Sequence, residues 1–141
     1  ITQPDTHLNP DSSLLIWQGA VKTILDKQKP ENSVIEIVLK NTAGKTLYRR
    51  LFYLVPPKKL SLPSTSVNMK VEQVNDGYQL TLSSERLAKN VFIGAEANGF
   101  FNDNYFDLLP GEQKVVLFKT ETILDTPAKA FKTKSLADSF D

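Results

Sequence analysis

The chain has 141 residues and a mass of 15.8 kDa, which is the size of one ordinary folded domain. Its composition, 40% hydrophobic and 23% charged, is typical of a globular protein and excludes disorder throughout. The net charge of +1 excludes a broad basic surface, and no apolar run is long enough to span a bilayer, so we expect neither a nucleic-acid nor a membrane partner.

Residues 1–13 are polar and contain two prolines, without the basic and apolar regions of a signal peptide. We interpret them as a linker. A chain that opens with Ile1 inside such a run is expected to be a fragment of a longer polypeptide.

The next segments show apolar residues at every second position, which is the period of a β-strand. Leu15 to Val21 is the first, and it carries Trp17, which we expect in a sandwich core, with an exposed position as the alternative. Residues 35–39 and 46–55 alternate in the same way, and the turn residues 41–44 between them predict a hairpin.

A second hairpin is predicted around Asp76-Gly77, because both residues suit a tight turn between residues 67–74 and 78–83. Residues 91–95 resume the strand pattern. Leu109-Pro110-Gly111-Glu112 has proline and glycine at the central positions of a type II turn, and a further strand follows at 115–118.

Together these segments predict an all-β fold, an antiparallel immunoglobulin-like β-sandwich of about seven to eight strands. A parallel α/β fold is excluded, whereas a barrel remains the structural alternative. We assign residues 14–120 to the sandwich, with the alternative that its first strands belong to a preceding domain. Residues 121–141 are expected to form a C-terminal tail that docks on the sandwich, through apolar residues that include Phe131, Leu136 and Phe140.

The residues that catalysis commonly requires are scarce. The chain has no cysteine and one histidine, His7, which excludes thiol nucleophiles, Cys-ligated metals and a Ser-His-Asp triad. Its glutamates are scattered over predicted strands and turns, so no catalytic pair of carboxylates is recognisable. We therefore assign no catalytic residue, no metal ligand and no cofactor.

The most distinctive segment is Phe101-Asn102-Asp103-Asn104-Tyr105-Phe106-Asp107-Leu108-Leu109-Pro110-Gly111-Glu112, followed by the apolar residues 115–118. It resembles the C-terminal immunoglobulin-like domain of β-mannosidases in glycoside hydrolase family 2. Residues 52–56, 80–84, 87–92 and 134–140 resemble further parts of that domain. The likeness is clearest over residues 50–141.

The resemblance implies a non-catalytic role. Such enzymes hydrolyse terminal β-mannosyl residues with retention, using two glutamates on a separate (β/α)₈ barrel of about 200 residues or more, which this chain is too short to contain. The chain alone is thus expected not to be an enzyme but an accessory domain that packs against and stabilises or borders the barrel. Its implied partners are the other domains of the same polypeptide, in a bacterial periplasmic or other extracytoplasmic setting.

Aromatic residues are the candidate contacts with a sugar or with another domain: Phe100, Phe101, Tyr105 and Trp17. If these rings are exposed, they favour an alternative function, in which the chain is an autonomous module that binds mannose-containing oligosaccharides. The structural interpretation is that Phe101 and Phe106 fill the sandwich end while Tyr105 bonds to backbone. Neighbouring Asx residues, among them Asp103 and Asp107, have oxygens that calcium accepts, but turn formation is the favoured interpretation.

Overall fold

The computed structural model describes residues 5–7 and 9–139, and the chain divides into two compact units, Ile1–Ser61 and Leu62–Asp141. Part of the predicted linker 1–13 lies outside the described residues. Phe140 of the predicted tail also lies outside them. The range 14–120 that we assigned to one sandwich spans both units. Each unit is described below by itself.

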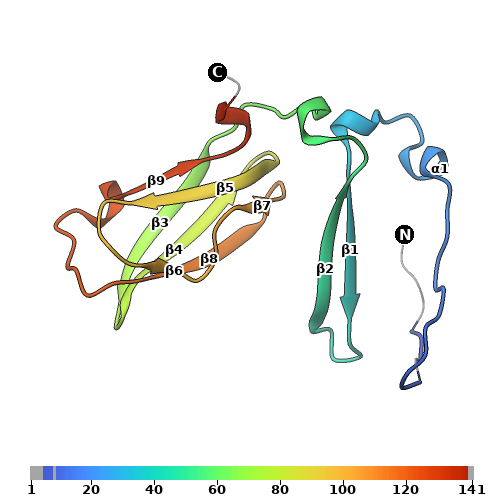
Figure 1. The fold of residues 1–141 in the computed structure, drawn as a ribbon, viewed down its shortest axis with the longest axis horizontal. Helices are drawn as coiled ribbons and strands as arrows, with labels where there is room; N and C mark the ends of the chain where they lie inside the picture. Colours follow the sequence, from blue (N-terminus) through green and yellow to red (C-terminus); the bar gives the residue numbers. More distant parts are fainter. Residues whose placement is uncertain (1–4, 8, 140–141) are drawn as a thin grey trace. The chain divides into compact units, whose positions relative to one another are not determined.

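The first unit is built on one antiparallel hairpin, β1 (Val34–Lys40) with β2 (Thr46–Tyr53), as the alternating segments predicted (Figure 1). Asn41 closes its turn, because the side-chain Oδ1 accepts hydrogen bonds from the backbone N–H of Ala43 and of Lys45. Gly44 has φ +77°, which glycine adopts without strain. Short helical turns flank the hairpin: α1 (Val21–Leu25), η1 (Pro30–Asn32) and η2 (Pro57–Lys59).

The hairpin keeps an uncovered apolar face. The register places Ile35 opposite Phe52 and Leu39 opposite Tyr48, so these side chains share one side of the two-stranded sheet. None of the described residues up to Ser61 is buried. Since a hairpin alone buries little apolar surface, this unit holds only a small part of the chain's hydrophobic packing.

The prediction of a strand over residues 15–21 is wrong. Residues 13–20 have no regular structure, and α1 begins at Val21. Trp17, expected in a core, is 42% exposed, with its ring lying over Gly19. Apolar residues at every second position are not enough to form a strand, because a strand also needs a neighbouring strand to bond its backbone groups. No described strand pairs with this segment.

The second unit is the predicted immunoglobulin-like sandwich. One sheet has the strand order β3-β4-β8-β6 and the other β7-β5-β9, with every pairing antiparallel (Figure 1). Its strands are β3 (Val67–Val74), β4 (Gly77–Ser84), β5 (Ala88–Ala95), β6 (Phe100–Phe101), β7 (Phe106–Leu108), β8 (Gln113–Lys119) and β9 (Phe131–Lys134). Two separate sheets rule out the barrel alternative.

The core lies between these two sheets. Alternate residues of β4 and β8 meet residues of β5 and β7, and the fully buried large side chains are Tyr78, Leu80, Leu82, Val91, Ile93, Leu108, Val116 and Phe118. Each such burial contributes about 1.5–3 kcal/mol relative to exposure. No helix among the described residues has the length and apolar character to cross a membrane.

Two predicted turns are present in the second unit. Glu112 donates its backbone N–H to the Leu109 carbonyl, and Gly111 has φ +74°, as a type II turn requires. The hairpin of β3 and β4 forms as predicted, although Val74 pairs with Gly77, so the turn residues are Asn75 and Asp76.

The segment 121–139 is more than a docked tail. It contains η3 (Pro127–Lys129), then β9, which pairs with β5, and finally η4 (Ala137–Ser139). Phe131 on β9 is 4% exposed, and its ring centroid lies 5.3 Å from that of Phe118. The backbone N–H of Leu124 donates to the Tyr78 hydroxyl at 2.7 Å. The C-terminal segment therefore supplies part of the sandwich itself.

Candidate functional site

The structure separates the aromatic residues that lie together in the sequence. Phe100 and Phe101 are neighbours on β6 and therefore point to opposite faces of the sheet. The Phe101 ring packs inward, 4.6 Å from the ring of Phe118, as the structural interpretation predicted. Phe100 is 82% exposed. Phe106 packs against the core, and Trp17 belongs to the other unit.

Tyr105 has a different position from the one expected. Among the described residues the Tyr105 hydroxyl has no backbone partner, whereas the Tyr78 hydroxyl accepts from the Leu124 N–H. The Tyr105 side chain is 67% exposed and its ring lies 5.2 Å from that of Phe92 on β5. Its backbone has φ +58°, a left-handed conformation that costs a non-glycine residue roughly 1–2 kcal/mol. The fold thus holds an aromatic pair at the surface despite local strain.

The Asx residues of this turn hydrogen-bond to neighbouring strands. Asn104 accepts from the Ile93 N–H at 2.8 Å and donates to the Ile93 carbonyl at 3.0 Å. Asn102 accepts from the Leu117 N–H at 2.7 Å, and Asp107 from the Asn90 N–H at 2.7 Å. Asp103 pairs with Lys114. These side chains replace ladder bonds where the strands end, so their oxygens stabilise the turn.

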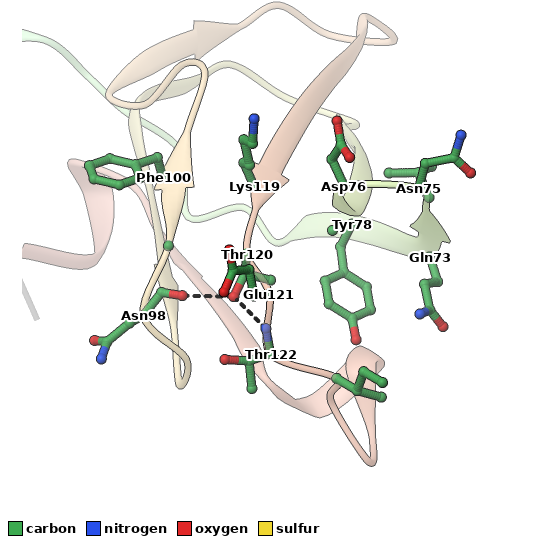
Figure 2. A pocket seen from close by; sticks show the side chains of 14 residues that line it. Gln73, Asn75, Asp76, Tyr78, Asn98, Phe100, Lys119, Thr120, Glu121 and Thr122 are labelled. Carbon is green, nitrogen blue, oxygen red and sulfur yellow. Dashed lines mark hydrogen bonds between the residues drawn. The ribbon is translucent and has the colours of Figure 1, made fainter.

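A cleft of about 760 Å³ lies at one end of the sandwich, and we call it the loop cleft (Figure 2). Three segments line it: the β3–β4 turn region (73–78), residues 98–100, and residues 119–123 after β8. Of the predicted site residues only Phe100 lies here. Sequence reasoning missed the others because nothing local shows that these three loops converge.

Thr120 ties the three segments together. Its backbone N–H donates to the Asp76 carbonyl at 3.2 Å, and its hydroxyl donates to the Asn98 carbonyl at 2.8 Å. The same hydroxyl accepts from the Thr122 N–H at 3.1 Å, and Figure 2 shows both hydroxyl bonds. One residue therefore fixes the spacing of all the loops that form the cleft.

Two glycines let these loops approach closely. A Cβ on Gly77, which has φ +138°, would overlap the carbonyl oxygen of Phe118. A Cβ on Gly99 would lie 2.5 Å from the Lys119 carbonyl oxygen. Because both contacts involve backbone, no larger residue fits without moving a strand.

The strand register places side chains in a row along the cleft. Phe100 lies opposite Lys119, and Lys119 lies opposite Gly77, across β6, β8 and β4. In Figure 2 the side chains of Lys119 and Asp76 both point upward, and the Phe100 ring at the left points away from them. Within the described part of the chain, no hydrogen bond or ion pair engages the side chains of Asp76, Lys119 or Glu121. Their polar groups are available to a ligand.

Comparison with known protein families divides the chain at the same place as the structure. A family model for an Ig-fold domain, named for mannosidases, matches residues 62–139, which is more than half of the chain. A second model, described as a mannosidase Ig/CBM-like domain, matches residues 2–59. No curated protein matches the chain. Both descriptions are of immunoglobulin-like domains, in agreement with the resemblance found in residues 101–112.

Proposed function

Because the chain belongs to the Ig-fold domain family of mannosidases, we propose that it is a non-catalytic accessory part of a β-mannosidase-like glycoside hydrolase. In this role it packs against a catalytic barrel of the same polypeptide and stabilises or borders it. The parent enzyme hydrolyses terminal β-mannosyl residues with retention, and its two catalytic carboxylates lie on that barrel. The match over residues 62–139, on a complete sandwich, is the observation that carries the proposal.

The surface pair Phe92 and Tyr105 supports a docking role. Aromatic side chains are enriched at protein interfaces, where they bury a large area and lose little conformational entropy. Asn104 ties this corner to β5 through its two bonds to Ile93, and the Tyr105 ring lies against the Phe92 ring. We assign the pair to the surface that contacts the barrel.

The first unit supports the same role with a different surface. Ile37, Leu39 and Tyr48 are 48%, 50% and 48% exposed on one face of the β1–β2 hairpin. Exposed apolar patches of this kind are typical of contact with another folded segment. In the proposal this contact comes from neighbouring domains of the parent polypeptide.

The proposal is tested first on the chain alone and then on the intact parent enzyme. The folded chain is expected to show no hydrolysis of aryl β-mannosides. In the parent, Tyr105→Ala is expected to cost about 2 kcal/mol of stability, because the interface loses a buried ring. Thermal unfolding followed by calorimetry measures this loss.

Val115→Ala is the matched control, since Val115 is 51% exposed on β8 and outside the Phe92–Tyr105 pair. Its effect is expected to stay within about 0.5 kcal/mol. Turnover that follows the folded chain through purification, or equal melting temperatures for the two parent variants, would contradict the proposal.

A further inference from the structure

The loop cleft combines an exposed ring with other apolar side chains. Phe100 is 82% exposed although its neighbour Phe101 packs inward, so the Phe100 ring adds little to the core. Ile123 and Val74, which also line the cleft, are 79% and 40% exposed. A flat apolar ring at the edge of such a cleft offers a surface on which a second ring can stack.

The polar side chains of the cleft match a neutral ligand rich in hydroxyl groups. Lys119 is a donor, Asp76 and Glu121 are acceptors, and Asn75 and Asn98 supply both functions. Each sugar hydroxyl donates and accepts, so this mixture suits neighbouring hydroxyls on one ring. Two carboxylates and one lysine give the cleft an excess of negative charge, which disfavours an anionic ligand. Among the described residues, no cluster of three metal-ligating side chains occurs.

The row across the strands sets the spacing of these groups. Neighbouring strands lie about 4.8 Å apart, so Lys119 is one strand away from Phe100, and Gly77 is two strands away. Gly77 has no side chain, and the backbone of β8 lies close against it. A sugar ring stacked on Phe100 therefore lies about one strand away from Lys119, which can donate to its hydroxyls.

The cleft is also organised before any ligand binds. The hydrogen bonds of Thr120 to Asp76, Asn98 and Thr122 hold the three segments of the loop cleft together. These segments are also anchored at the ends of strands that contribute to the sandwich core. Loops fixed on a rigid scaffold lose less conformational freedom on binding, which favours recognition even by a shallow surface.

We propose that the loop cleft is a carbohydrate subsite that binds one pyranose unit of a mannose-containing oligosaccharide, with Phe100 stacking on the ring and Lys119 and Asp76 bonding its hydroxyls. The choice of mannose rests on the proposed function, whereas the pyranose itself follows from the cleft. For a single sugar ring stacked on an open surface we expect a weak dissociation constant, of about 1 mM.

The test is an amide-shift NMR titration of the full chain with β-1,4-mannotetraose. We expect saturable shifts in the three cleft segments, residues 75–78, 98–100 and 119–123. Phe100→Ala is expected to weaken binding about tenfold, because the stacking surface is removed. Its spectrum should otherwise match the wild type, since the Phe100 side chain lies outside the core.

Tyr105→Ala is the matched control, an exposed aromatic of the same unit that does not line the cleft. Its affinity is expected to equal that of the wild type. The proposal is overturned if roughly 20 mM sugar causes no saturable shift, if Phe100→Ala binds as well as the wild type, or if the shifts centre on Tyr105. Equal affinity for cellotetraose would overturn the assignment to mannose.

The two proposals fail separately. The accessory role is measured by the melting temperature of the parent enzyme and depends on Tyr105. The subsite is measured by shifts in the isolated chain and depends on Phe100. A chain that binds no sugar but stabilises its parent rejects only the subsite, and the converse result rejects only the docking role.

Discussion

At the scale of single residues, the structure gives two glycines of the second unit different roles. Gly77 and Gly111 both have positive φ, at +138° and +74°. Nothing lies within 4 Å of a Cβ built on Gly111, whereas a Cβ on Gly77 would overlap the Phe118 carbonyl. Gly111 is therefore needed for its backbone conformation alone, and Gly77 is needed for both conformation and space.

We predict that Gly77→Ala destabilises the second unit by about 3 kcal/mol or more, because strain and steric overlap add. Gly111→Ala is the matched control, and it should lose only about 1 kcal/mol from left-handed strain. Urea unfolding followed by circular dichroism measures both values. Equal losses would show that the close approach at Gly77 is relieved by a small backbone shift.

At the scale of elements, β9 contributes more to the hydrophobic core than its place near the C-terminus predicts. The sequence predicts that residues 121–141 form a docked tail. In the structure, however, Phe131 on β9 contacts the rings of Tyr78, Phe101 and Phe118. Removal of this side chain would leave a cavity in the middle of the aromatic cluster.

Phe131→Ala is therefore expected to cost about 3–5 kcal/mol in the free energy of unfolding. Lys132→Ala, on the same strand but with its side chain in solvent, should change stability by less than about 0.5 kcal/mol. Chemical unfolding of the two variants provides the comparison. A loss below about 1 kcal/mol for Phe131→Ala would mean that the tail docks without completing the core.

At the scale of the whole molecule, hydrophobic packing is distributed unequally. The second unit contains every buried residue among those described, and the first unit has one hairpin with short helical turns and no buried residue in its described part. Local stability follows buried apolar contact, so the two units should open independently.

Hydrogen exchange of the full chain tests this distribution. Amides of Leu80 and Leu82 on β4 are expected to exchange only through global unfolding, at a cost of about 5–10 kcal/mol. Amides of the β1–β2 hairpin should exchange with opening free energies of about 0–2 kcal/mol. Equal protection in the two units would contradict the expectation and indicate a partner for the hairpin face.

The candidate site was less predictable than the fold. The aromatic run 100–106 contains one residue of the loop cleft, Phe100, and the sequence does not say which of its rings face outward. Phe100 and Phe101 have the same side chain, and only their positions on β6 separate them. The remaining cleft residues come from segments about twenty positions apart in the sequence, joined by the hydrogen bonds of Thr120.

The sequence by itself determined the period-two strands, the turns at Asn41–Gly44 and Leu109–Glu112, and the family resemblance, because these depend on local backbone preference and side-chain pattern. Only the tertiary structure decided the division at Ser61, the incorporation of β9 into the second sheet, the coil around Trp17 and the convergence of three loops at one cleft. Those outcomes depend on which distant segments bury one another, and no local pattern encodes that choice.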